Sequence, residues 1–305
     1  MLTVSTLAPA QLRARLAGPG IGLQTGPFVT WLRSPIARVA DGVGLLYADY
    51  PLHEPGGFVD FHIHLERAGG WRRWLRPQVR FDHDGEAPFK PLPLDHALPM
   101  FEWVLNWCVS SRAHAWLIIH AAVVEKDGWA AVLPAPPGSG KSTLCAALVA
   151  RGWRLLSDEL ALVSLADGLL QPLPRPISLK NASIAVVAAY APGTVMSPPV
   201  ADTTKGTVAH MKAPAASVAR AGERARPAWV VFPRYQAGAA PTMVPMAPAR
   251  SFMALAENSF NYNLLGAAGF EALAGLVAGS RAYQFTYSAL DDAIAAFDAL
   301  ARPDA

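Results

Sequence analysis

Apolar positions along this chain follow two different patterns, which meet near residue 113. From Phe28 to about Arg80, short apolar runs are separated by Gly and Pro, which is typical of short strands. The clearest run is Val59 to Glu66, in which every second residue is apolar. The polar residues between them are Asp60, His62, His64 and Glu66. A solvated strand face explains this alternation; the alternative is a metal site, because alternate residues of a strand project together.

A Pro-rich stretch from Ala87 to Pro99 is expected to be a linker, followed by a helix from Met100 to Ser111. Apolar residues recur in this segment at the i, i+3, i+4, i+7 spacing of a buried helix face. They are Phe101, Val104, Leu105 and Cys108. We interpret Trp103 and Trp107, which widen that face, as core or domain-contact residues; stacking on a ligand is the alternative.

Beyond Ala113 the pattern changes to longer apolar strands and a helix. We expect strands from Trp116 to Glu125 and from Trp129 to Pro134, joined by a turn at residues 126–128. The Ala- and Pro-rich stretches at 213–216 and 237–249 are expected to be loops.

A helix is predicted from Lys141 to Arg151, ended by Gly152, and a buried strand from Trp153 to Ser157 follows it. The whole pattern predicts an α/β fold. We place a β-rich N-terminal region, ending in a helix, at residues 1–112, and a second domain at residues 113–305.

Composition narrows the class of partner. The chain has 305 residues, 52% of them hydrophobic, and a net charge of +3 without any run of Lys or Arg. This charge suits an anionic small ligand and argues against a nucleic-acid partner. The N-terminal residues do not resemble a signal peptide, and no apolar run approaches the roughly 20 residues that cross a bilayer. We therefore expect a cytoplasmic protein without a membrane partner. Cys108 and Cys145 have no metal-ligand spacing, which argues against a zinc site or a disulfide scaffold.

The segment from Val132 to Leu144 contains the sequence of a phosphate-binding P-loop, the Walker A motif. An apolar strand, a loop and a helix beginning at Gly-Lys-Ser-Thr follow one another, which is the context this motif requires. Backbone N–H groups of Gly138, Ser139 and Gly140 could surround a phosphate, and the helix N-terminus would add its dipole. Lys141 would reach the β- and γ-phosphate oxygens, Ser142 would bind Mg²⁺, and Thr143 ends the motif. The motif departs from its usual pattern at Ala135, where Gly is usual; a Gly-rich turn before an ordinary helix is the alternative.

Two acids, Asp158 and Glu159, directly follow the predicted strand that ends at Ser157. Phosphoryl transfer needs a metal ligand and a group that orients or deprotonates the acceptor, and this pair could supply both. The alternative is that Asp158 caps the next element while Glu159 is solvated. His120, in an apolar run, is by itself more typical of a hydrogen-bonded core residue than of a catalytic one.

Three segments taken together resemble the core of HPr kinase/phosphorylase and its relatives. They are Ile119-His-Ala-Ala-Val-Val124, Ala135 to Thr143, and Arg151-Gly-Trp-Arg-Leu-Leu-Ser-Asp-Glu159. Four further segments resemble the HPr-kinase-related group A proteins of bacteria, which are associated with exosortase and exopolysaccharide genes. They are 174–181, 204–210, 232–235 and 259–262. The resemblance implies a P-loop kinase core of the HPr kinase/PEP carboxykinase type.

The resemblance also implies roles for individual residues. Asp158 corresponds to the general base, His120 to its assistant, and Glu159 to a second acid near the metal. Thr143 stands where the family commonly has Glu, and the stretch linked to phosphorylase activity is not recognisable. The implied cofactors are ATP and Mg²⁺, with GTP as an alternative donor. The implied partners are a small protein or peptide, such as a PqqD-like protein, and further copies of the chain in a homo-oligomer.

The sequence thus predicts a Mg²⁺-dependent phosphotransferase that moves the γ-phosphoryl group to a hydroxyl, with Ser of a small protein or peptide as the expected acceptor. The alternatives are a kinase of a small-molecule or sugar hydroxyl and a nucleotide-binding scaffold or sensor without transfer. Arg175 and Lys205, in turn-rich sequence, could line the phosphate pocket and stabilise the transferring group. For both, a solvated surface position is the alternative, and His210 has a weaker claim still.

Overall fold

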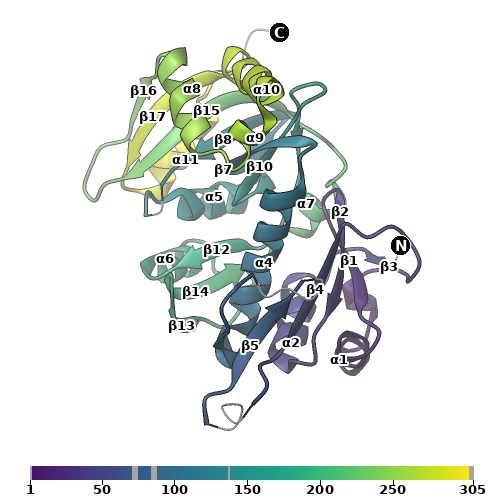
Figure 1. Cartoon of the computed structure of the whole chain (residues 1–305). Helices are drawn as coiled ribbons and strands as arrows, with labels where there is room; N and C mark the ends of the chain where they lie inside the picture. The colour runs from purple at the N-terminus through teal and green to yellow at the C-terminus, as the bar shows by residue number, and fades with distance from the viewer. Residues whose placement is uncertain (1, 71–74, 84–87, 137, 302–305) are drawn as a thin grey trace.

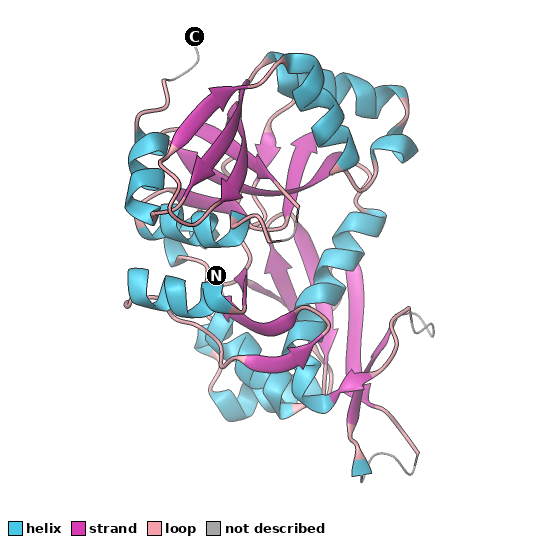
Figure 2. Ribbon diagram, turned by 90° about the vertical axis from the view of Figure 1, so that its left-hand side faces the viewer, coloured by secondary structure: helices cyan, strands magenta, loops and turns pink. Residues whose placement is uncertain are grey.

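The computed structural model describes residues 2–70, 75–83, 88–136 and 138–301. The chain forms a mixed α/β structure with a six-stranded, an eight-stranded and a three-stranded sheet. Figure 1 shows the first sheet at the lower right, the second at the top and the third between them on the left. Figure 2 shows helices on both faces of the upper sheet.

The N-terminal region is built on the six-stranded sheet, whose order is β3-β1-β2-β4-β5-β6. Its strands are β1 (Ile21–Thr25), β2 (Phe28–Arg33), β3 (Leu52–His53), β4 (Phe61–Arg67), β5 (Gln78–Asp82) and β6 (Leu92–Pro93). Strand β4 confirms the predicted alternation, because Phe61, Ile63 and Leu65 are buried. Among the residues that the structure describes, no group of three or more His, Cys, Asp or Glu side chains could hold a metal ion, on this strand or elsewhere.

Helices make up more of this region than the sequence patterns predicted. They are η1 (Val4–Thr6), α1 (Pro9–Ala17), α2 (Ala37–Leu46), η2 (Leu94–His96) and α4 (Ala97–Arg112). The expectation of strands throughout 28–80 is wrong for α2, where Val39, Val43 and Leu46 are buried at helical spacing. Two glycines in α2 obscured this pattern; a Cβ at Gly42 would lie 2.4 Å from Leu98 of α4, so the small residue allows the two helices to pack closely.

The predicted linker is shorter than expected. Ala87 lies outside the described residues, but β6, η2 and the first turn of α4 occupy the stretch that follows it. The predicted face of α4 is confirmed, since Phe101, Val104, Leu105 and Cys108 are all buried. Trp107 packs against the rings of Phe81 and Phe89, as a core residue.

The eight-stranded sheet has the order β11-β10-β7-β8-β15-β17-β16, with β9 paired to β7. Its strands are β7 (Trp116–Lys126), β8 (Trp129–Pro134), β9 (Arg154–Ser157), β10 (Leu160–Ser164), β11 (Leu170–Gln171), β15 (Arg226–Tyr235), β16 (Thr242–Pro245) and β17 (Arg281–Tyr287). Helices α5 (Lys141–Ala150) and α11 (Leu290–Asp298) cover one face, and α8 (Pro248–Glu257), α9 (Tyr262–Leu265) and α10 (Ala267–Ala278) cover the other (Figure 1). The predicted β7–β8 hairpin, α5 and β9 are confirmed.

Strands β8 and β9 run in the same direction, because both are antiparallel to β7. Their carboxyl ends therefore meet at one edge of the sheet. The segment that follows β8 is the predicted P-loop, and the segment that follows β9 is Asp158-Glu159.

The three-stranded sheet contains β12 (Ile177–Lys180), β14 (Gly206–Met211) and β13 (Val200–Thr203), and α6 (Ala182–Tyr190) follows β12. Two predicted loops contain regular structure instead: α7 (Ala215–Ala219) overlaps the first, and β16 and the start of α8 overlap the second. Their Ala- and Pro-rich sequences carry no clear periodicity, so tertiary packing decides their structure. Ser217 of α7, for example, accepts a hydrogen bond from the Leu155 N–H at 3.1 Å.

One hydrophobic cluster extends from Val4 to Phe297 and includes residues of both predicted regions. Within the described ranges, no helix combines the length and the apolar character that a membrane crossing requires.

Candidate functional site

The loop between β8 and α5 contains two glycines with left-handed backbone conformation. Gly138 and Gly140 have φ of +85° and +87°, which residues with a Cβ rarely adopt. Tyr287 Oη donates to the Gly140 carbonyl at 3.0 Å, and the Tyr235 N–H donates to the Ser139 carbonyl at 2.9 Å. These bonds fix the orientation of both carbonyls. Pro137 lies outside the described residues.

Ala135, which departs from the Walker A pattern, fits its position. It is buried and is not among the residues with positive φ, so glycine is not required there. One of the predicted phosphate donors is engaged elsewhere, since the Ser139 N–H lies 3.3 Å from the Pro136 carbonyl.

Lys141 is the first residue of α5 and is 8% exposed, and its Nζ has no hydrogen-bond partner. Buried polar groups are nearly always paired, and a buried unpaired ammonium is costly. The arrangement therefore fits a polar ligand that Lys141 would contact. Such a ligand would lie in a cavity of about 890 Å³, which the loop residues 138–143 line together with His120, Glu159 and Lys180.

Ser142 connects α5 to the acid at the end of β9. Its Oγ donates to Asp158 Oδ2 at 3.2 Å, and the Ser178 N–H of β12 donates to the same oxygen at 3.0 Å. Asp158 is 3% exposed, and its Oδ1 has no partner. The expected proximity of Ser142 to a carboxylate is thus present, but the carboxylate is that of Asp158 rather than that of Glu159.

Glu159 is held by basic groups from two other strands. His120 Nε2 lies 2.9 Å from Glu159 Oε2, and Lys180 Nζ lies 3.9 Å from Glu159 Oε1. The Phe260 ring packs against His120, with ring centroids 5.8 Å apart. His120 therefore contacts Glu159, whereas the family resemblance implied that it would assist Asp158.

The two adjacent acids have opposite electrostatic environments. Burial, together with the neighbouring charge of Glu159, raises the pKa of Asp158. Burial by itself would also raise the pKa of Glu159, but the hydrogen bond from His120 and the charges of Lys141 and Lys180 outweigh it and hold that pKa well below its usual value. The two pKa values are therefore shifted in opposite directions, that of Asp158 upward and that of Glu159 downward.

The two acids differ in their access to the large cavity. Glu159 lines the large cavity beside the loop, whereas Asp158 does not. Both acids line a second, small cavity of about 20 Å³, whose lining includes residues of α4 and β14.

The structure places Arg175, Lys205 and His210 outside the large cavity. Arg175 is buried and forms an ion pair with Glu102 at 2.7 Å. Lys205 lies over the ring of Trp103, with Nζ 5.2 Å from its centroid, and partial burial lowers its pKa. His210 is buried beside the small cavity, and burial lowers its pKa.

Sequence reasoning assigned no role to several residues that line the large cavity. Lys180 is the most informative, because it brings a second cation to Glu159. Tyr190, Tyr235 and Tyr287 add aromatic surface. A local signal for Lys180 exists only in Asn181, whose φ of +53° and bonds to Thr207 fix the turn that follows β12. Nothing in the sequence indicates that β12 returns to the end of β9.

These residues fit a phosphate with a divalent cation. The helix N-terminus and the Lys141 Nζ, which has no hydrogen-bond partner, suit a phosphate. The Ser142 hydroxyl and the Asp158 carboxylate beside it supply two oxygen ligands for the cation. Mg²⁺ usually takes only one or two protein carboxylates together with phosphate oxygens, so a larger cluster of acids is not required.

Comparison of the sequence with models of known protein families and with characterised proteins gave no match.

Proposed function

We propose that this protein binds a nucleoside triphosphate with Mg²⁺ and transfers its γ-phosphoryl group to a hydroxyl. The observation that carries the proposal is the position of Lys141: a buried ammonium without a hydrogen-bond partner lies at the start of α5, in the lining of a cavity that Glu159 and His120 also line. A P-loop sequence alone supports only nucleotide binding. The carboxylate–imidazole pair on the same cavity supports transfer to an acceptor.

The phosphates would lie against the loop at 138–140 and the N-terminus of α5, where backbone N–H groups and Lys141 supply positive potential. Lys180, which is near Glu159, supplies a second cation to the lining of the cavity. Ser142 and Asp158 would hold Mg²⁺, directly or through water. When bound, this ion would neutralise charge on the phosphate oxygens.

Glu159 is the residue that we propose as the proton acceptor, in place of Asp158. The oxygen of the acceptor hydroxyl forms a bond to the γ-phosphorus while the bond from that phosphorus to the bridging β,γ-oxygen breaks. As the bond to phosphorus forms, the hydroxyl becomes acidic enough for the Glu159 carboxylate, despite its lowered pKa, to accept the proton, and the nucleoside diphosphate leaves. His120 holds this carboxylate in place at 2.9 Å. Asp158 is less suited to the step because Ser142 and the Ser178 N–H already donate to one of its oxygens, a position that suits the ion.

The proposed acceptor is a serine of a small protein or peptide, on the strength of the family resemblance. The site is open enough for a side chain to reach Glu159, because the cavity has room for more than one ligand group. A small-molecule hydroxyl is the competing acceptor, and an acceptor panel separates the two.

Nucleotide binding is tested by calorimetry with ATP and GTP, with and without Mg²⁺. We expect binding that requires the lysine: Lys141→Met should abolish it, whereas Lys126→Met, at an exposed lysine of the β7–β8 turn, should not. Transfer is tested with γ-labelled ATP and two sets of acceptors, serine peptides and small hydroxyl compounds. Binding without transfer to any acceptor in wild-type protein would leave a nucleotide-binding scaffold as the function.

A further inference from the structure

The small cavity behind Asp158 is lined by an unusual concentration of buried polar groups. It lies between α4 of the N-terminal region, the segment at 173–178 and β14. Five of its lining residues carry a buried polar side-chain atom without a hydrogen-bond partner. These atoms are Trp103 Nε1, Asp158 Oδ1, Arg175 Nε, Ser178 Oγ and His210 Nε2.

Such a concentration is rare, because buried polar groups are nearly always satisfied. The volume of about 20 Å³ is enough for one water molecule, which needs two to four polar partners. Arg175 Nε and Trp103 Nε1 can only donate, and the carboxylate oxygen Asp158 Oδ1 accepts. One water can therefore accept from Arg175 and donate to Asp158.

Arg175 is itself fixed by α4. Its Nη2 donates to Glu102 Oε2 at 2.7 Å and to the Glu102 carbonyl at 3.0 Å, and its Nη1 donates to Asn106 Oδ1 at 2.7 Å. Tyr47, the residue after α2, donates to the other oxygen of Glu102 at 2.7 Å. Both Glu102 and Arg175 are less than a tenth exposed, so this pair is not screened by solvent.

The same segment of chain holds Asp158 from a second direction. The Ser178 N–H, three residues after Arg175, donates to Asp158 Oδ2 at 3.0 Å. Just before Arg175, the Pro174 carbonyl accepts from Tyr50 Oη at 2.8 Å. The segment is thus attached to the N-terminal region at one end and to Asp158 at the other.

We propose that Glu102 and Arg175, through Ser178 and one buried water, position the Asp158 carboxylate toward Ser142, so that the N-terminal region sets the geometry of the Mg²⁺ site. The inference rests on the proposed function, in which Ser142 and Asp158 hold the ion. Glu102 and Arg175 are positioning residues that do not line the large cavity. This role differs from the contact with the transferred phosphate that the sequence suggested for Arg175.

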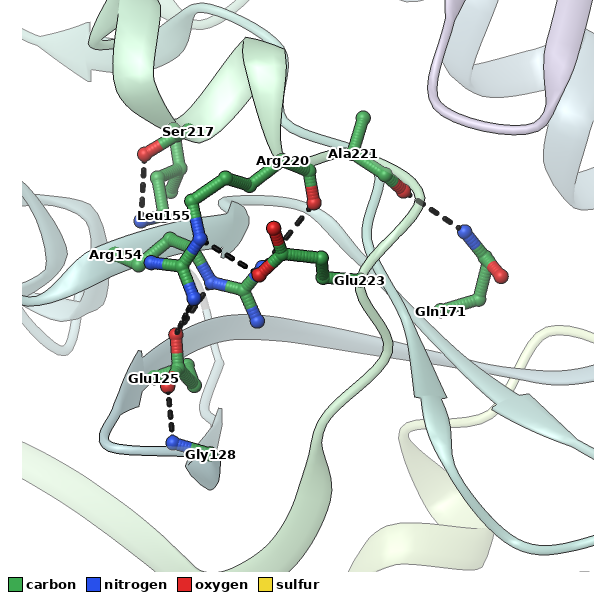
Figure 3. Close-up of polar contacts among 9 residues, drawn as sticks. All are labelled: Glu125, Gly128, Arg154, Leu155, Gln171, Ser217, Arg220, Ala221 and Glu223. Atoms are coloured by element: carbon green, nitrogen blue, oxygen red, sulfur yellow. Dashed lines mark hydrogen bonds and ion pairs between the residues drawn. The ribbon is translucent and has the colours of Figure 1, made fainter.

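A matched control exists elsewhere in the fold. Glu125 and Arg154 form a second buried ion pair, with 2% and 6% of their side chains exposed. Figure 3 shows this pair with Arg220 and Glu223, and Glu125 also accepts from the Gly128 N–H at the β7–β8 turn. Neither residue of this pair lines either cavity. Glu125→Gln therefore measures the loss of stability that follows from breaking a buried ion pair in general.

The experiment compares the Mg²⁺ concentration that half-saturates ATP binding in wild-type protein, Glu102→Gln and Glu125→Gln. We expect Glu102→Gln to raise this concentration about 10-fold or more, as the loss of outer-shell partners of a metal site does, and Glu125→Gln to leave it unchanged. Asn106→Ala removes only one hydrogen bond to Arg175 and replaces Glu102→Gln in the comparison if that variant does not fold. We expect it to raise the half-saturating Mg²⁺ concentration by a smaller factor.

A double variant of Glu102→Gln and Asp158→Asn tests whether Glu102 acts on the Mg²⁺ site through Asp158. If Glu102 acts through Asp158, the double variant requires no more Mg²⁺ than Asp158→Asn alone. Additive effects, or equal Mg²⁺ requirements for Glu102→Gln and Glu125→Gln, would overturn the positioning role while leaving the proposed function intact. Wild-type protein without Mg²⁺-dependent ATP binding would overturn both. A crystal structure is expected to show one water within hydrogen-bond distance of Asp158 Oδ1 and Arg175 Nε. A cavity without this water would contradict the role that we propose for it.

Discussion

Ser142 Oγ lies 3.2 Å from Asp158 Oδ2, which joins the first turn of α5 to the residue that follows β9. Asp158 is thus hydrogen-bonded to the helix, whereas Glu159 lines the large cavity. Two adjacent carboxylates thus acquire different surroundings, and the assignment of their roles follows from this contact.

The two acids should lose different functions when each is made neutral. Glu159→Gln removes the proton acceptor, so we expect the transfer rate to fall by about 10²- to 10⁴-fold with little change in the Mg²⁺ requirement. Asp158→Asn should instead raise the Mg²⁺ requirement about 10-fold or more. Transfer rates measured over a series of Mg²⁺ concentrations distinguish them. The reverse pattern would restore Asp158 as the base.

Nucleotide should protect the protein against heat through Lys141. A ligand present at 100 times its Kd adds about 2.7 kcal/mol to the free energy of unfolding, and the melting temperature rises accordingly. We expect ATP with Mg²⁺ to produce this rise in wild-type protein and none in Lys141→Met. Lys126→Met is the control and should keep the full rise. Differential scanning calorimetry measures all three.

Gly138 and Gly140 provide a matched pair for the loop. Their φ values are nearly equal, but a Cβ at Gly140 would lie 2.5 Å from Tyr287 Oη, whereas one at Gly138 would meet nothing within 4 Å. We expect Gly138→Ala to lower the free energy of unfolding by about 1 kcal/mol, from backbone strain alone, and Gly140→Ala to lower it by about 2–4 kcal/mol. Urea unfolding curves measure the difference. Equal losses would show that Tyr287 moves aside without cost.

His210 should make the stability depend on pH. Burial lowers its pKa in the folded protein, so the unfolded chain binds more protons once the pH falls below about 6.5. Stability is therefore fully present above that pH and declines below it, by at most about 1.4 kcal/mol per pH unit. We expect His210→Gln to reduce this slope between pH 6.5 and 5, measured by urea unfolding at each pH. An unchanged slope would assign the decline to other groups.

Much of the fold was predictable where the signal is local. The alternation in β4, the helical face of α4, and the strand, loop and helix around Gly138 to Thr143 follow from periodicity and from residue types that suit particular backbone angles. Helix α2 was missed because its glycines weaken the helical pattern that packing against α4 supports. Loops rich in Ala and Pro were likewise assigned without periodicity, and tertiary contacts overruled the assignment.

The sequence by itself determined which groups meet at the edge of the sheet: the loop that ends in Lys141 and the acids at 158 and 159, because each directly follows a strand. Only the tertiary structure decided how these groups are used. Which acid lines the cavity depends on the distant partners His120 and Lys180, and Arg175 is drawn to Glu102 on a helix more than 70 residues earlier. Local sequence specifies backbone conformation, but the partner of a charged side chain depends on which strands and helices lie side by side, and that is set by the packing of the whole chain.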